Sequence, residues 1–284
     1  MRFIFLGTGT SAGVPAIACD CEVCTSEDPR DRRTRTGACV QWTDAAGRER
    51  VVLIDTTPDL REQALRHRLR RCDAILFTHN HVDHVFGLDE VRRFNAVMQA
   101  PIDIYAEKHT MDSLRRVYQH VFDAENNVNK SFVATLIAHE IKPDVPIDLW
   151  GLRFTPLRLM HGRLPILGWR IDALDGGSLA GASGSLSEGA VERGWLPLAY
   201  CTDVSAFPPD AWGKLTGLRT LVLDALRWRH HPTHQTIDQA VQTAQQIGAE
   251  QTWFVHMAHQ VKHSDAQERM PEGVGLAWDG LTLE

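Results

Sequence analysis

The sequence has none of the long apolar runs that membrane-spanning helices need, and no secretory leader is expected from its first residues. No stretch of its 284 residues approaches the roughly 18 consecutive apolar residues of a membrane-spanning helix. The apolar run near the start, residues 3–6, is too short for the hydrophobic region of a signal peptide, and no small-residue cleavage site follows it. We therefore expect a cytoplasmic protein without a membrane partner.

An excess of positive charge is also missing, since the formal net charge is −6. This charge argues against a global electrostatic attachment to nucleic acid, although a local basic cleft stays compatible with it. The turn at Gly7-Thr8-Gly9 lacks the third glycine of a dinucleotide-binding fingerprint. No repeat of solenoid period and no linker divides the chain, so a single domain over 1–284 is expected.

Short apolar segments alternate with helical segments in two similar halves. This pattern predicts an α/β protein in which two sheets lie between layers of helices. The predicted strands are 2–6, 38–43, 50–54, 73–77, 102–106, 166–171, 198–201, 220–224 and 252–255, and the predicted helices are 59–71, 88–98, 110–122 and 236–248. Residues 133–159 predict short strands interrupted by Pro143, Pro146 and Pro156. The Gly- and Ser-rich segment 172–194 predicts a flexible insertion.

The chain has 14 histidines, and their arrangement is informative in Thr78-His79-Asn80-His81-Val82-Asp83-His84. Imidazole and carboxylate groups suit zinc, manganese or iron. The motif follows a predicted buried strand, so His79 and His81 can face one cation while Asp83 and His84 face a second. Two cations about 4 Å apart can act on both the attacking and the leaving oxygen of a displacement. A solvated His-rich turn is the alternative.

Three of the six cysteines lie close together as Cys19-Asp20-Cys21-Glu22-Val23-Cys24, within a segment of no clear periodicity at 7–31. Three thiolates need one further ligand to complete a closed tetrahedral zinc site. A structural zinc would order a loop of this length, which has few other means of doing so. Reduced, buried thiols are the alternative.

The motif His-x-His-x-Asp-His resembles the signature of the metallo-β-lactamase superfamily. The resemblance implies a four-layer αββα sandwich of two mixed sheets flanked by helices, with further ligands at later strand ends. By this resemblance one cation is held by His79, His81 and His161, a second by Asp83, His84 and His256, and Asp203 bridges them. Asp55, which follows a predicted strand, is expected to orient a ligand histidine, with a simple strand-end cap as the alternative.

The opening Gly7-Thr8-Gly9-Thr10-Ser11 and the cysteine cluster narrow the resemblance. Together they are similar to the branch of phosphoribosyl cyclic phosphate phosphodiesterases and of accessory proteins of pyrroloquinoline quinone biosynthesis. The resemblance implies that His259, three residues after His256, is the fourth ligand of the structural zinc, with His263 and Cys39 as weaker candidates. It also implies that His234 contacts phosphate or protonates the leaving group, with Asp83 as the less favoured proton donor.

The expected function is metal-dependent hydrolysis of a phosphodiester by metal-activated hydroxide. The resemblance favours a small cyclic phosphate such as phosphoribosyl 1,2-cyclic phosphate. Two divalent cations (zinc or manganese, or iron) and one structural zinc are expected, and a homodimer is compatible with the sequence. The open alternatives are hydrolysis of a thioester or lactone, processing of transfer-RNA 3′ ends, and a non-hydrolytic role in cofactor biosynthesis. Transfer-RNA processing usually needs an extended basic arm, which this sequence lacks.

Overall fold

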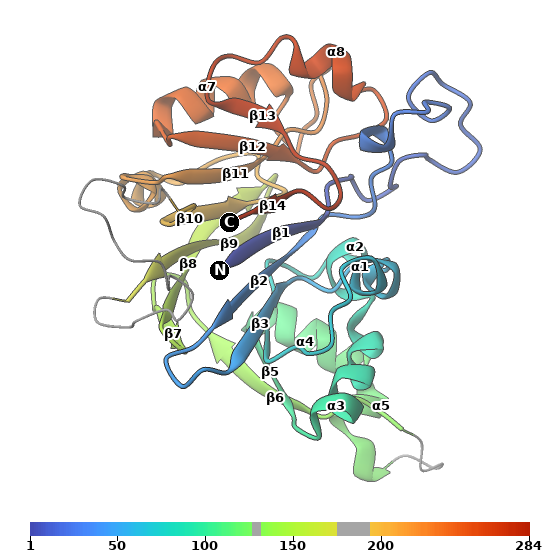
Figure 1. Cartoon of the computed structure of the whole chain (residues 1–284), viewed down its shortest axis with the longest axis vertical. Coiled ribbons are helices and arrows are strands. Elements are labelled where there is room, and N and C mark those ends of the chain that lie inside the picture. The colour runs from blue at the N-terminus through green and yellow to red at the C-terminus, as the bar shows by residue number, and fades with distance from the viewer. Residues whose placement is uncertain (127–131, 175–193) are drawn as a thin grey trace.

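Two seven-stranded sheets pack face to face and helices cover their outer sides (Figure 1). The computed structural model describes residues 1–126, 132–174 and 194–284. It confirms the four-layer α/β sandwich of two mixed sheets. Most of the predicted insertion at 172–194 lies outside the described residues, while Asp172 and Ala173 belong to a strand.

The first sheet has the order β14-β1-β2-β3-β4-β5-β6. Pairing is antiparallel from β14 to β3 and parallel from β3 to β6. Its strands are β1 (Arg2–Gly7), β2 (Gly37–Thr43), β3 (Glu49–Ile54), β4 (Ala74–Leu76), β5 (Ile102–Glu107), β6 (Leu136–Ile141) and β14 (Thr282–Leu283). The last strand returns from the second half of the chain and pairs with β1 (Figure 1).

The second sheet repeats this arrangement in the order β13-β12-β11-β10-β9-β8-β7. Pairing is antiparallel from β7 to β10 and parallel from β10 to β13. Its strands are β7 (Ile147–Leu149), β8 (Leu152–His161), β9 (Leu164–Ala173), β10 (Leu198–Cys201), β11 (Thr220–Asp224), β12 (Gln251–Val255) and β13 (Val274–Leu276). The two similar halves of the sequence therefore correspond to the two sheets.

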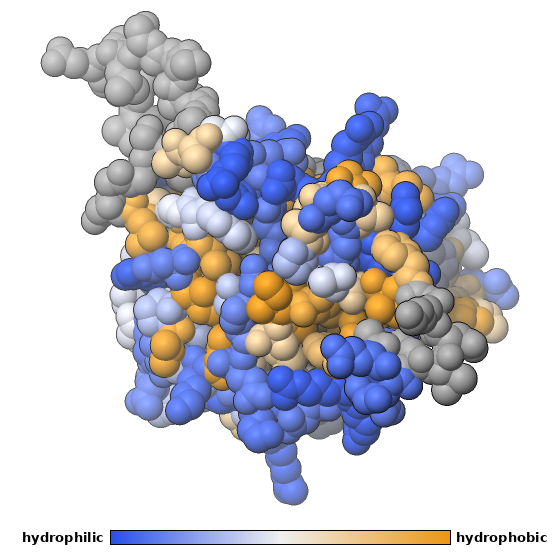
Figure 2. Space-filling model, turned by 90° about the horizontal axis from the view of Figure 1, so that it is seen from below, coloured by the Kyte–Doolittle hydropathy of each residue, from blue (hydrophilic) through white to orange (hydrophobic). Residues whose placement is uncertain are grey.

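Helices pack on the outer faces through buried apolar side chains. The first sheet is covered by α1 (Leu60–Arg66), α2 (Val82–Val85), α3 (Arg92–Met98), α4 (Lys108–Val117) and α5 (Gln119–Phe122), with the 3-10 turns η2 (Leu88–Val91) and η3 (Ala124–Asn126). The second is covered by α6 (Pro209–Trp212), α7 (Ile237–Ile247) and α8 (His263–Gln267), with η4 (Gly213–Leu215). The turn η1 (Pro29–Asp31) lies in the cysteine-containing segment. Polar residues surround a band of hydrophobic ones on the face seen from below (Figure 2).

An aromatic layer holds the two sheets together. Phe3 and Phe5 of β1, Phe154 of β8 and Trp169 of β9 are fully buried between the sheets. Burying such side chains stabilises the fold by about 25 cal/mol per Å² of apolar surface. Because this layer sets how the sheets face each other, it also decides which strand ends meet at the edge of the sandwich.

Several predicted elements need correction. The helix predicted over 59–71 ends at Arg66, since Arg68 adopts a left-handed φ of 52° that a helix cannot continue through. The helix predicted over 88–98 begins as the 3-10 turn η2, and the one over 110–122 is divided into α4 and α5. The last strands and α8, after residue 256, had no prediction.

Pro156 does not interrupt a strand, as the sequence predicted, but lies in the middle of β8. The backbone N and C=O of Pro156 point away from β9, toward the side on which β7 lies. The pairing with β7 does not extend to Pro156, and the Pro156 carbonyl accepts a hydrogen bond from the Asp144 N–H at 2.8 Å. Proline is tolerated at such an edge because the missing N–H has no strand partner there.

None of the helices in the described ranges is long and apolar enough to cross a membrane.

Candidate metal centres

The residues of the predicted dinuclear site converge at one edge of the sandwich, because they follow the ends of strands in both sheets. The motif 79–84 follows β4, His161 ends β8, Asp203 follows β10 and His256 follows β12. Asp203 and His256 have left-handed φ angles of 57° and 60°, as does Asp55 after β3 at 65°. Such angles are uncommon outside glycine, and they turn the chain sharply where each strand ends.

The first group consists of His79, His81 and His161, whose ligand atoms lie within 4.8 Å of one another. His79 and His161 are buried, whereas His81 is exposed. Burial lowers the pKa of all three imidazoles, and most strongly that of His79. They are therefore neutral near pH 7, with a lone pair free to bind a cation.

The second group consists of Asp83, His84, Asp203 and His256, which are all buried. His84 Nε2 lies 3.4 Å from Asp83 Oδ2 and 3.3 Å from Asp203 Oδ1. His256 Nε2 lies 3.2 Å from Asp203 Oδ2 and 3.6 Å from Asp83 Oδ2. The Asp203 Oδ2 atom is also 4.0 Å from His79 Nε2, so this carboxylate lies between the two groups.

The donor atoms of these groups fit divalent cations. His79 Nε2, His84 Nε2 and His256 Nε2 are buried and have no hydrogen-bond partner in the described part of the chain. Such atoms are rare in folded proteins and call for an explanation. Burial by itself lowers the pKa of His84, yet the carboxylates of Asp203 and Asp55 raise it well above its ordinary value. The site therefore holds an excess of negative charge, which bound cations would offset.

Asp55 holds one of these histidines in place. Its carboxylate accepts hydrogen bonds from the Thr78 N–H and hydroxyl at 2.8 Å, and lies 2.8 Å from His84 Nδ1. This contact directs His84 Nε2 toward Asp83 and Asp203. Asp55 thus lies where the sequence placed it, beside a candidate ligand.

Replacing Asp55 by asparagine should lower the affinity of the site for zinc or manganese by about 10- to 100-fold, because His84 loses the carboxylate that orients it. Competition of the purified protein with a chelator would measure this. The exposed Asp148→Asn variant, remote from the site, should keep the parental affinity. An unchanged affinity in a folded Asp55→Asn protein would contradict the orienting role.

Asp224, at the end of β11, is a buried residue of the site that the sequence reasoning missed. Its carboxylate lies 3.2 Å from His234 Nδ1 and 3.4 Å from His256 Nδ1, and it accepts a hydrogen bond from the Gln235 N–H at 3.1 Å. The sequence did offer one signal for this role, because Asp224 ends a buried apolar strand in the same way that Asp55 follows one. Asp224 holds two histidines in position at once.

His234 lies beside the candidate ligands, as the resemblance implies. Its ring stacks on that of His256 at 4.7 Å and meets that of His161 edge-on at 4.5 Å. The following helix α7 begins at a capping box formed by Thr236 and Gln239, which fixes the chain just after His234. His231, by contrast, is only half-buried, and its ring centre lies 5.1 Å from that of His234.

The cysteine cluster forms a second, separate group. The Sγ atoms of Cys19, Cys21 and Cys24 lie 3.1, 3.5 and 3.4 Å from His259 Nδ1. A tetrahedral zinc with ordinary bond lengths separates sulfur and nitrogen ligands by about 3.5 Å, so the four residues fit a closed zinc site. A hydrogen bond from the Cys24 backbone lowers the pKa of Cys21 to about 6, whereas burial raises that of Cys24 to about 11, so Cys21 is the thiol that ionises first.

The two weaker candidates for the fourth ligand lie elsewhere. Cys39 is buried in β2 among the apolar residues under the first helical layer, and His263 packs against Trp278 at the start of α8. His259 itself follows the candidate ligand His256 by three residues. The backbone of Met257, between them, exchanges hydrogen bonds with Thr8 and Thr10. The cysteine cluster is therefore linked to the segment that carries His256.

Comparison with known proteins agrees with this geometry. A family described as "Beta-lactamase superfamily domain" matches residues 50–257. A protein of Porphyromonas gingivalis named octanoyltransferase is 38% identical over 99% of this chain, which spans 51% of that protein's length. A crystal structure of a diphosphatase from the PhnP family is 38% identical, with a TM-score of 0.82 over 100% of this chain and 97% of that one.

The zinc-bound PqqB of Methylobacterium extorquens is 20% identical, with a TM-score of 0.72 over the full length of both chains, and it supports the fold alone. The matching family and the convergence of histidines and aspartates at the strand ends agree with each other. The chain therefore belongs to the metallo-β-lactamase superfamily, has the fold of its metal-dependent hydrolases and resembles the PhnP family within it.

Proposed function

We propose that this protein hydrolyses a phosphodiester, with a small cyclic phosphate such as phosphoribosyl 1,2-cyclic phosphate as the expected substrate. The observation that supports the proposal most is the placement of His234, held by Asp224 beside the candidate ligands His161 and Asp203. The diphosphatase of the PhnP family is 38% identical to this chain, and its name describes an enzyme that acts on a phosphoryl group. Two divalent cations are proposed, one for each group of ligands.

Bound at the two groups, divalent cations would supply a nucleophile at neutral pH and polarise the phosphoryl oxygens. His79, His81 and His161 would hold the first cation, and Asp83, His84 and His256 the second. Asp203, between them, would keep their separation constant. This arrangement leaves His234 as a nearby imidazole that is free to act on the substrate.

His234 would provide the proton for the leaving oxygen. The Asp224 carboxylate beside Nδ1 favours a proton on that nitrogen, which leaves Nε2 available to the substrate. In its imidazolium form, whose positive charge Asp224 would stabilise, His234 can donate the Nε2 proton to the departing alkoxide and is then left as a neutral imidazole. An alkoxide is a poor leaving group, so this donation matters most for an unactivated ester such as a ribose cyclic phosphate.

Thioester hydrolysis is the second candidate, because the Porphyromonas gingivalis relative is named an octanoyltransferase. The two candidates differ in their need for His234. A thiol has a pKa near 8.5, so a thiolate departs without prior protonation, whereas an alkoxide does not. A thioesterase on this site should therefore depend much less on His234 than a phosphodiesterase.

A substrate panel tests the proposal. Protein loaded with zinc or manganese, and the same protein stripped of metal, would be given a ribose 1,2-cyclic phosphate, bis(p-nitrophenyl) phosphate and an octanoyl thioester. Metal-dependent turnover of the cyclic phosphate is the expected result. Turnover of the thioester alone, with the metal content verified, would replace the phosphodiesterase proposal by the second candidate.

A further inference from the structure

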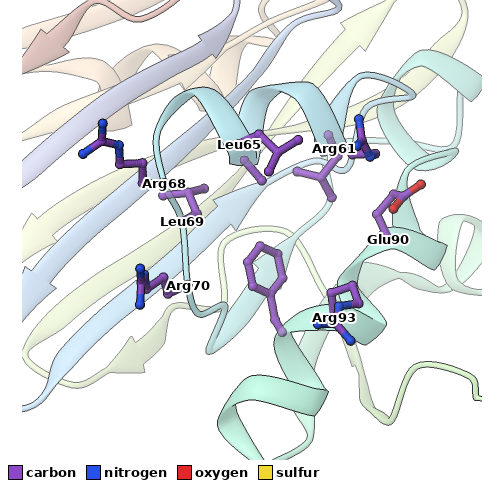
Figure 3. Close-up of a pocket in the computed structure, with 10 residues that line it drawn as sticks. Arg61, Leu65, Arg68, Leu69, Arg70, Glu90 and Arg93 are labelled. Carbon is purple, nitrogen blue, oxygen red and sulfur yellow. The ribbon is translucent and has the colours of Figure 1, made fainter.

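A cavity of about 420 Å³ opens between α1 and the segment η2–α3, in the outer helical layer (Figure 3). This volume falls in the range of about 300–1,000 Å³ that is typical of small-molecule sites. None of the candidate metal ligands lines it. The cavity is therefore separate from the site described above.

The middle of the cavity is aliphatic. Leu60, Ala64, Leu65 and Leu69 line it from α1 and the residues that follow, and Phe94 is the single aromatic residue of the lining. Leu65 is 59% exposed, so its side chain is accessible to a ligand that enters from solvent. Leu65 and Leu69 lie between two groups of charged side chains (Figure 3).

The two ends of the cavity are basic. Arg68 and Arg70 lie at one end and Arg61 and Arg93 at the other, where Glu90 is the only acidic lining residue (Figure 3). Four arginines against one glutamate give a local charge of +3 in a chain whose net charge is −6.

These arginines differ from their neighbours in having few partners. Within the described residues, no carboxylate lies at ion-pair distance from Arg68, Arg70 or Arg93. The adjacent Arg66 and Arg71, in contrast, pair with Asp279 at 3.1 Å and with Asp73 at 2.6 Å. Arg61 pairs with the adjacent Glu62, whereas the guanidinium groups of Arg68, Arg70 and Arg93 are available to an external anion.

We propose that this cavity binds an amphipathic anion, in which a carboxylate or phosphate head is attached to an aliphatic chain. Arginine binds both kinds of head through paired hydrogen bonds. The aliphatic lining complements a hydrocarbon chain, whereas a nucleobase would need aromatic faces on which to stack. The proposal is independent of the reaction catalysed at the metal centre.

Calorimetric titration of the full-length, metal-loaded protein tests this site with decanoate, decyl phosphate, inorganic phosphate and decanol, each below its aggregation concentration. Decanoate or decyl phosphate should bind saturably. Decanol lacks the anionic head and inorganic phosphate lacks the hydrocarbon chain, so both should bind at least about tenfold more weakly. Comparing the two acids identifies the preferred head.

Variants localise the binding. Arg68→Gln and Arg93→Gln should each weaken decanoate binding by about fivefold or more, and Leu65→Asn should also weaken it. Arg116→Gln, an exposed arginine on α4, is the matched control and should have no effect. The His161→Ala variant should also bind decanoate as before, since it alters only the candidate metal centre.

Three results would overturn the proposal. One is binding of decanol as tight as that of the two acids. Another is that the Arg68→Gln and Arg93→Gln variants bind decanoate and decyl phosphate as tightly as the parent protein does. The third is binding of an acidic amphipathic peptide when neither acid binds, which would make the same surface a protein-docking site instead.

Discussion

Replacing His234 by alanine should lower kcat for a ribose cyclic phosphate by about 10²- to 10⁴-fold, with little change in metal content. The physical reason is the loss of the proton that Nε2 would deliver to the departing alkoxide. Turnover of bis(p-nitrophenyl) phosphate should fall much less, since p-nitrophenolate leaves readily without a proton. Steady-state kinetics on both substrates, with metal analysis of each preparation, measures the difference.

The controls for this experiment come from the same loop and from the residue that holds His234. His231→Ala, which removes a half-buried imidazole 5.1 Å from His234 between ring centres, should stay within a few-fold of the parent. Asp224→Asn should reproduce part of the loss, about 10- to 100-fold, because His234 and His256 both lose their carboxylate partner. Loss of a bound metal from His234→Ala would contradict the proposed role and make His234 a ligand.

The second large effect is expected at the cysteine cluster. Cys24→Ser should remove one zinc per chain and lower the stability by more than about 4 kcal/mol, as expected when a structural metal is lost. In a chain of this size that corresponds to a fall in Tm of about 10 °C. Apart from the isolated bridges of Gly9 and Val14, the segment 8–31 has η1 as its one regular element, so three ligands within it and His259 outside it would add much of its order.

The matched control is Glu22→Gln, which lies between Cys21 and Cys24. It breaks only an exposed ion pair with Lys262, and such pairs contribute about 0–1 kcal/mol. Zinc analysis and thermal unfolding of both variants give the comparison. A Cys24→Ser protein with the parental zinc content and Tm would show that the cluster holds no structural metal.

Much of the fold was predictable because its signals are local. The burial of β11 and β12 is visible as apolar runs, and α7 is bounded by a capping threonine and by Gly248, whose φ of 71° suits only a residue tolerant of the left-handed region. Elements determined by distant contacts were not predictable. Pro156 reads as a strand breaker in sequence, and only the ending of β7 beside it shows that β8 can continue.

Some residues of the candidate site were predictable from sequence, and others were not. The motif 79–84 and the cysteine cluster are recognisable because several ligand-type residues are adjacent in the chain. Asp224 has no such neighbours, and its two histidine partners are 10 and 32 residues further along. Its role appears only when the ends of β11 and β12 are placed side by side. Arg61, Arg68 and Arg70 are near neighbours in the chain, and the packing of α3 beside α1 adds Arg93 to them.

The sequence by itself determined which residue types are available to bind metal and where each half of the fold forms, because periodicity and motif spacing are properties of a few consecutive residues. The tertiary structure brings His259 beside Cys19, 240 residues away, and Asp203 between the two histidine groups, as the resemblance implied but no local pattern of the sequence encodes. The physical reason is that these distances depend on how the two sheets pack through their aromatic layer. That packing is the sum of many apolar contacts, and no short stretch of the chain encodes it.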